Sequence, residues 1–149
     1  MHRIYLFVAW VVVAIQVLVL PSCTPKDVRD KLSEAESIME EDPDSALHII
    51  NAIDTINLKS KKDWAKYALL NVQARTKTNE IITSDSLISR AVTYYQEKGD
   101  SPDLMKSLFY NADILYNQGR YTSSIYNSTQ AYDLAKGFKD DYWIAKSAE

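Results

Sequence analysis

The sparse glycine and proline content of this chain constrains its fold more than any other feature. Three glycines and four prolines punctuate 149 residues, whereas a β-sandwich or β-barrel needs turn residues about every ten positions. Long helices joined by short turns fit this spacing, so the sequence predicts an all-α protein. The length suits one domain preceded by a targeting segment.

The first 22 residues differ chemically from the rest of the chain. Arg3 places a positive charge near the start, and the stretch from Ile4 to Leu20 is apolar apart from Gln16. A charged start followed by an apolar run is typical of an export signal. The alternative is an uncleaved single-span anchor, because the run reaches the lower limit, about 17 residues, for crossing a bilayer.

The end of this segment, Leu20-Pro21-Ser22-Cys23, resembles a bacterial lipobox, the cleavage motif of lipoproteins. The resemblance implies a signal peptide over 1–22 and a mature chain over 23–149 whose first residue, Cys23, carries a diacylglycerol on its thiol. It therefore places the protein in the bacterial cell envelope, lipid-anchored to the outer membrane and facing either the periplasm or the cell surface. Cys23 is the only cysteine of the chain, so a disulfide framework is excluded.

Beyond Cys23 the apolar residues recur at helical spacing almost throughout. The pattern predicts helical hairpins at about 24–54, 61–97 and 103–138, followed by the start of a further helix at 140–149. Thr24-Pro25 and Ser101-Pro102 each offer a capping hydroxyl followed by proline at the first helical position. The run from Trp64 to Thr76 is apolar on more than one face, so we expect this helix at the centre of the domain.

The hairpin from Met105 to about Phe138 resembles a degenerate tetratricopeptide repeat, a helix pair of about 34 residues. Small residues occupy the positions at which the two helices of that repeat approach most closely or meet the next repeat, and a glycine and a tyrosine occupy the turn: Ala112, Ser124, Ala131, Gly119 and Tyr121. Tyr121 and Ile125 are also expected on the inward face of the second helix. The departures from the repeat are Leu108, Asn111, Ser128 and Lys136, where it has a tryptophan, a leucine, an aromatic residue and a proline.

The resemblance implies antiparallel hairpins stacked as a right-handed solenoid, with the first helix of each hairpin lining a concave groove. The residues expected to face a protein or peptide partner in that groove are Lys106, Phe109, Asp113, Tyr116 and Asn117. The alternative is that Phe109 and Tyr116 pack against the next repeat. The last helix lacks an end signal, so we expect the natural array to continue beyond Glu149 and residues 139–149 to fray in isolation.

The composition argues against other classes of function. A net charge of −3 gives no basic face for nucleic acid. His48 is the only histidine after Cys23, and no second imidazole or thiol accompanies it as a metal ligand or catalytic base. The acidic run from Glu40 to Asp44 lacks the glycine and ligand spacing of a calcium loop, and Asp42-Pro43 favours a turn between helices. We therefore expect no enzyme activity, no metal and no cofactor.

Three segments resemble an Asp-Ser/Thr-apolar sequon for bacterial O-glycosylation: Asp44-Ser45-Ala46, Asp54-Thr55-Ile56 and Asp85-Ser86-Leu87. The same residue types start helices, so both interpretations stay open. The sequence as a whole predicts a lipid-anchored protein-interaction scaffold of the envelope. The alternative is the sensor half of a membrane-spanning transcriptional regulator, with its transmembrane and helix-turn-helix parts absent from this sequence.

Overall fold

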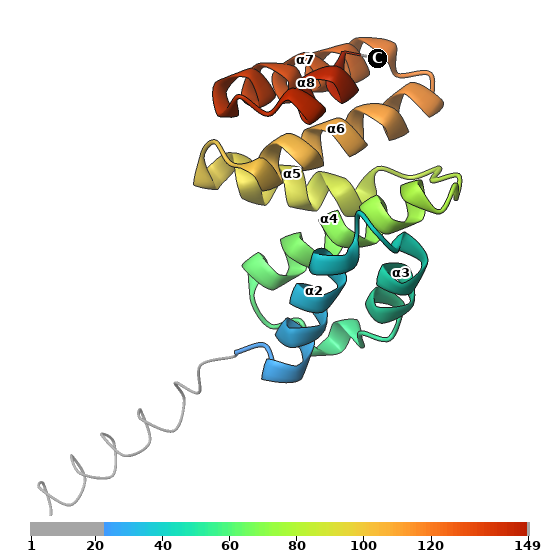
Figure 1. Cartoon of the computed structure of the whole chain (residues 1–149), viewed down its shortest axis with the longest axis vertical. Coiled ribbons are helices and arrows are strands. Elements are labelled where there is room, and N and C mark those ends of the chain that lie inside the picture. The colour runs from blue at the N-terminus through green and yellow to red at the C-terminus, as the bar shows by residue number, and fades with distance from the viewer. Residues whose placement is uncertain (1–22, 149) are drawn as a thin grey trace, which may run out of the picture.

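The computed structural model describes residues 23–148, and the regular structure of this part is entirely helical (Figure 1). The elements are α2 (Lys26–Ile38), α3 (Pro43–Asn51), the short 3-10 helix η1 (Thr55–Asn57), α4 (Lys61–Lys77), α5 (Ser86–Lys98), α6 (Pro102–Asn117), α7 (Tyr121–Phe138) and α8 (Asp141–Ser147). The predicted all-α class is confirmed for these residues. The predicted signal peptide over 1–22 lies outside them.

Two of the predicted helix starts have the expected capping chemistry. The Asp42 carboxylate accepts a hydrogen bond from the Ser45 N–H at 3.0 Å, and Pro43 is the first residue of α3. In the same way the Ser101 hydroxyl accepts from the Leu104 N–H at 3.1 Å at the start of α6. The acidic run therefore forms a turn between α2 and α3, and the Ser45 hydrogen bonds lower the pKa of Asp42.

Thr24 does not cap α2 as predicted. It is buried, and its hydroxyl oxygen accepts hydrogen bonds from the N–H groups of Lys59, at 2.9 Å, and Ser60, at 3.3 Å. The helix begins at Lys26 without a side-chain cap. Thr24 thus ties the first described residues to the loop between η1 and α4.

Consecutive helices pack against one another along the whole described chain, and α4 also contacts α2 and α6. Figure 1 shows the result as a stack in chain order, from α2 and α3 at one end to α7 and α8 at the other. Among the helices of residues 23–148, none combines the length and the apolar character that crossing a bilayer requires.

The central position predicted for the helix of the run from Trp64 to Thr76, observed as α4, is confirmed by its part in two apolar clusters. Leu70 and Ala74 of α4 pack with α2 and α3, whereas Leu69 and Val72 pack with α5 and α6. A helix that is apolar around most of its circumference has to be buried on several sides. α4 therefore joins the two halves of the core.

The predicted close approach of α6 and α7 is also observed. Ala112 and Ser124 are both buried, and the Ser124 hydroxyl donates a 2.8 Å hydrogen bond to the Ala112 carbonyl oxygen. Gly119, with φ of 75°, makes the turn between the helices in a backbone conformation that other residues rarely adopt. Small side chains at the crossing let the two backbones approach, and Gly119 reverses the chain between them.

Candidate functional site

The structure divides the five side chains predicted to line a groove on α6. Lys106 and Phe109, in the first half of the helix, are half-buried, whereas Asp113, Tyr116 and Asn117, towards its end, are exposed. The difference arises because α8 packs beside the first half of α6. These five residues therefore do not form one continuous free surface.

Phe109 is part of the packing between α6 and α8. Its ring centroid lies 5.3 Å from that of Trp143, which is only 5% exposed. The Lys146 ammonium lies 5.5 Å from the centre of the Phe109 ring, and the Lys106 ammonium lies 6.0 Å from that of Trp143. The alternative left open by the sequence, packing against the next helical unit, describes Phe109.

Two titratable groups of α6 lie near this packing. Although the residue is exposed, desolvation of its carboxyl group by the surrounding side chains raises the pKa of Asp113, and the positive charge of Lys146 acts against this shift. Burial likewise raises the pKa of the Tyr110 phenol, and the negative charge of Glu40 adds to the shift. The packing of α8 on α6 therefore brings the Asp113 carboxyl group close to a lysine of α8.

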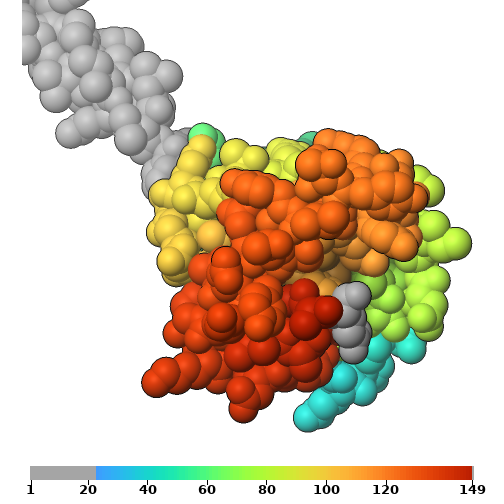
Figure 2. All heavy atoms as spheres, turned by 90° about the horizontal axis from the view of Figure 1, so that it is seen from above, coloured from blue at the N-terminus to red at the C-terminus, as the bar shows by residue number. Residues whose placement is uncertain are grey.

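The most unusual surface lies on the first half of α7, where the buried side chain is small and large ones are exposed, while Leu134 in the second half packs against the core. The buried residues of this helix are Ser124, Ala131 and Ala135. Tyr121 is 58% exposed, and Ile125 and Tyr126 are each 65% exposed. Figure 2 looks onto this end of the molecule, where α7 in orange and α8 in red form much of the visible face.

Tyr116 of α6 extends this exposed group across the turn. It is 62% exposed, and its ring meets that of Tyr121 edge-on with centroids 5.4 Å apart. We call Tyr116, Tyr121, Ile125 and Tyr126 the α7 aromatic surface. Of these, only Tyr116 was predicted as a partner-binding residue.

The inward positions predicted for Tyr121 and Ile125 are wrong. Both side chains are exposed, and the buried residues of α7 are Ser124, Ala131 and Ala135. Ala131 and Ala135 follow Ser124 by seven and eleven positions, which places the three on one narrow face of the helix. Ile125 lies about 100° around the helix from Ser124 and so falls off this face, whereas Tyr121, three positions before Ser124, lies near it, and the spacing alone does not predict its exposure.

A polar pocket of about 430 Å³ adjoins the α7 aromatic surface. It lies between α5, α6 and α7, and its lining residues are Asp85, Ser89, Asn111, Leu115, Arg120, Thr122, Ser123, Tyr126 and Asn127. Asn111 is buried, and within residues 23–148 its Oδ1 atom has no hydrogen-bond partner. Tyr126 belongs to both the pocket and the aromatic surface, so the two are continuous.

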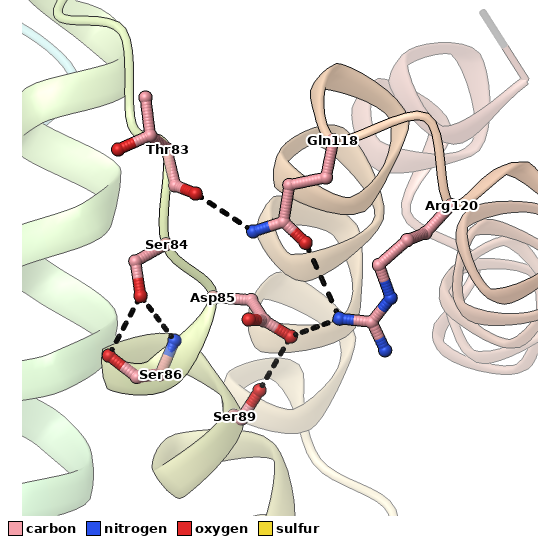
Figure 3. A network of polar contacts seen from close by, with 7 residues as sticks. All are labelled: Thr83, Ser84, Asp85, Ser86, Ser89, Gln118 and Arg120. Atoms are coloured by element: carbon pink, nitrogen blue, oxygen red, sulfur yellow. Dashed lines mark hydrogen bonds and ion pairs between the residues drawn. The ribbon is translucent and has the colours of Figure 1, made fainter.

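A network of polar contacts fixes one edge of this pocket (Figure 3). The Arg120 Nη1 atom lies 3.0 Å from Asp85 Oδ2, which also accepts a hydrogen bond from the Ser89 hydroxyl at 3.5 Å. Gln118 Nε2 donates to the Thr83 carbonyl oxygen at 3.0 Å. The network therefore ties the turn between α6 and α7 to the segment that precedes α5.

The other residues singled out by the sequence lie apart from this surface. His48 is exposed on α3, and within residues 23–148 no three His, Cys, Asp or Glu side chains gather as a metal site. In two of the three sequons the aspartate has a structural partner: Asp54 accepts from the Ile56 N–H at 3.1 Å, and Asp85 pairs with Arg120. The glycosylation interpretation stays a prediction.

Cys23, the predicted lipid anchor, is exposed at the start of the described chain. Its sulfur lies 3.6 Å from an Arg29 side-chain nitrogen. Exposure at this point leaves room for an acyl group, and the residue stays a predicted anchor. No protein-family model, curated protein or solved structure matches the chain.

Proposed function

We propose that this chain is a lipid-anchored scaffold of the bacterial cell envelope that binds a protein partner without catalysing a reaction. The domain is a short solenoid of degenerate tetratricopeptide-like hairpins, formed by α2 with α3, α4 with α5, and α6 with α7. Its partner is a protein or peptide with an apolar face. Cys23 holds the scaffold to the membrane, and the α7 aromatic surface binds the partner.

The packing of the helices supports the solenoid. Each helix contacts the next one in the chain, and α4, the first helix of its pair, lies against α2 and α6, the first helices of the neighbouring pairs. In a stacked-hairpin array each unit buries its apolar face mainly against its neighbours. The small-residue contact between Ala112 and Ser124 supports the resemblance of α6 and α7 to a tetratricopeptide hairpin.

The observation that carries the functional proposal is the outward direction of the large side chains on α7. Single exposed apolar residues are common on proteins, but a contiguous exposed group is typical of a binding surface. Tyr is enriched at the centre of protein interfaces, where a polar rim surrounds it. Here the hydroxyl, amide and charged side chains of the adjoining pocket supply such a rim.

Photo-crosslinking in cells that produce the protein tests this proposal. A photoreactive amino acid at Ile125 is expected to give a discrete covalent adduct with the partner, which mass spectrometry then identifies. Matched positions are Asp133, exposed on the second half of α7, and Gln96, exposed on α5. Adducts of equal yield at all three positions, or none at Ile125, would contradict an interface centred on the aromatic surface.

A further inference from the structure

A second cavity has no part in the function proposed above, and none of its lining residues belongs to α7. It encloses about 430 Å³ between the start of α4 and the second half of α5. Its lining residues are Leu58, Lys59, Ser60, Lys61, Trp64, Ala65, Arg90, Thr93, Tyr94 and Glu97. Two aromatic rings and three cationic side chains therefore share one hollow.

The charge of this cavity differs in sign from that of the protein. The whole chain carries a net charge of −3, but Lys59, Lys61 and Arg90 face a single carboxylate, that of Glu97, in the cavity lining. Within residues 23–148, none of these three cations takes part in an ion pair. The cavity is thus electrostatically complementary to an anion.

The aromatic side chains of the cavity are already in contact with cations. The Arg90 guanidinium carbon lies 4.4 Å from the centre of a Trp64 ring, and the Lys98 ammonium lies 5.6 Å from that of Tyr94. Trp and Tyr are enriched where proteins meet the headgroup region of a membrane, because one end of each ring system is apolar and the other is polar. A cavity of this composition combines the two groups that favour an anionic lipid surface.

The position of the cavity relative to Cys23 points to the same ligand. Thr24 is bound through its hydroxyl to the N–H groups of Lys59 and Ser60, and both of those residues line the cavity. Consecutive Cα atoms are about 3.8 Å apart, so Cys23 is held beside this loop with no linker between them. A membrane that holds Cys23 therefore lies next to the cavity.

We propose that this cavity, which we call the basic cavity, binds the phosphate-bearing headgroup of an anionic phospholipid in the membrane that anchors the chain. The diacylglycerol proposed on Cys23 supplies two acyl chains, which hold a protein to a membrane but leave the orientation of the domain free, and a cluster of basic residues is a common further contribution to membrane binding. Lys and Arg side chains near an anionic leaflet each contribute to binding. Docking at the basic cavity would fix the orientation of the domain on the bilayer.

Lysine footprinting of the full-length protein in vesicles tests this inference. The chain is reconstituted in phosphatidylcholine alone or mixed with phosphatidylglycerol, treated briefly with an acylating reagent and analysed peptide by peptide. Lys59 and Lys61 are expected to react about tenfold more slowly in the anionic vesicles. Lys136 and Lys139, which are exposed and do not line the cavity, serve as internal controls and are expected to react at the same rate in both.

Two variants sharpen the result. Arg90→Glu reverses a cavity charge and is expected to abolish the protection of Lys59 and Lys61, whereas Lys136→Glu makes the same change in net charge and is expected to preserve it. Equal reactivity of Lys59 and Lys61 in the two vesicle types of the parent protein would overturn the inference. Protection by inorganic phosphate in phosphatidylcholine vesicles, equal to that in anionic vesicles, would also overturn it by showing a site for a soluble anion.

The inference rests on the proposed anchor for its geometry, but the two fail separately. The mass of the N-terminal peptide from the same samples reports whether Cys23 is acylated, and the footprint reports whether the cavity meets the lipid. Retention of residues 1–22 with a protected cavity would contradict the lipoprotein proposal alone. An acylated Cys23 with an unprotected cavity would contradict the headgroup site alone.

Discussion

The indole of Trp143 meets the ring of Phe109 edge-on, with centroids 5.3 Å apart and an angle of 74° between the planes. Edge-to-face pairs of this kind add about 0.5–1.5 kcal/mol to the effect of burial. The contact joins α8 to α6 and removes Phe109 from the surface that a partner would meet. Tyr116, two turns further along α6, stays exposed.

The first prediction separates these two aromatic residues of α6. Phe109→Ala is expected to lower the free energy of unfolding by about 3 kcal/mol, because it leaves a cavity beneath Trp143. Tyr116→Ala removes an exposed side chain and its contact with Tyr121, so the expected loss is below about 1 kcal/mol. Urea unfolding followed by circular dichroism measures both. Equal losses for the two variants would contradict the assignment of Phe109 to the core.

The second prediction concerns the buried phenol of Tyr110. Tyr110 is 1% exposed, and within residues 23–148 its hydroxyl oxygen has no hydrogen-bond partner. An unsatisfied buried polar group costs about 1–3 kcal/mol, so Tyr110→Phe is expected to stabilise the fold at neutral pH by about 1 kcal/mol. Tyr116→Phe, which removes the same hydroxyl from an exposed ring, is the control and is expected to change stability little.

The pH dependence of this variant follows from the same burial. Because the folded-state pKa of Tyr110 is raised above the ordinary value of 10.0, the unfolded chain releases the phenol proton first as the pH rises. The folded state then binds more protons than the unfolded state, and stability is lost as the pH rises above that ordinary value. Tyr110→Phe is expected to make the loss shallower in alkaline unfolding curves. Identical slopes for the variant and the parent would contradict this account.

The third prediction tests the crossing of α6 and α7. Ser124→Ala removes the hydrogen bond to the Ala112 carbonyl oxygen and is expected to cost about 1 kcal/mol. Ser124→Leu forces the two helices apart and is expected to cost about 2–3 kcal/mol. Thr129→Leu, at an exposed position of α7, is the matched control and is expected to stay within about 0.5 kcal/mol of the parent. A tolerated Ser124→Leu would show that the crossing does not depend on a small residue.

The features of this structure that the sequence predicts are those fixed by a few neighbouring residues. Strong local signals, such as Ser101-Pro102 before α6 and the small pair Ala112 and Ser124, are enough to place helix ends and the α6–α7 contact. They are local because capping and close approach depend on a few neighbouring residues. The direction of each aromatic or large apolar side chain depends on residues far away in the sequence, and the predictions of these directions are only partly right.

Phe109 and Ile125 show why. Both lie on helices with several apolar positions, and the choice of which positions face inward depends on the partner helix. Trp143 of α8 covers Phe109, a contact between residues 34 positions apart in the sequence. The small stripe of α7 turns Ile125 outward. The prediction that residues 139–149 fray does not take into account the contact of Trp143 with α6. Hydrogen exchange of the Ile144 to Lys146 amides would measure how firmly that contact holds α8.

The fourth prediction concerns membrane attachment. If Cys23 is the acylated first residue of the mature protein, Cys23→Ala abolishes metabolic labelling with a radioactive fatty acid and leaves an unprocessed precursor. Ser33→Ala, at an exposed position of α2, is expected to be labelled and processed as the parent is. A parent protein that keeps residues 1–22 and carries no lipid would instead support the uncleaved membrane anchor.

The fifth prediction concerns the proposed binding of the protein partner at the α7 aromatic surface. The partner identified by crosslinking at Ile125 is titrated, by isothermal calorimetry, with the parent and with two double variants. Tyr121→Ala with Ile125→Ala is expected to weaken binding by about tenfold or more, since truncation of central aromatic and apolar contacts costs the most at interfaces. Because both side chains are exposed, the thermal midpoint is expected to stay nearly unchanged.

The matched control is Thr129→Ala with Asp133→Ala, which changes two exposed residues further along the same helix. This control is expected to bind the partner as tightly as the parent does, whereas the Tyr121 and Ile125 variant is expected to bind it more weakly. Equal dissociation constants for all three proteins would contradict the proposal that this surface of α7 is the binding site.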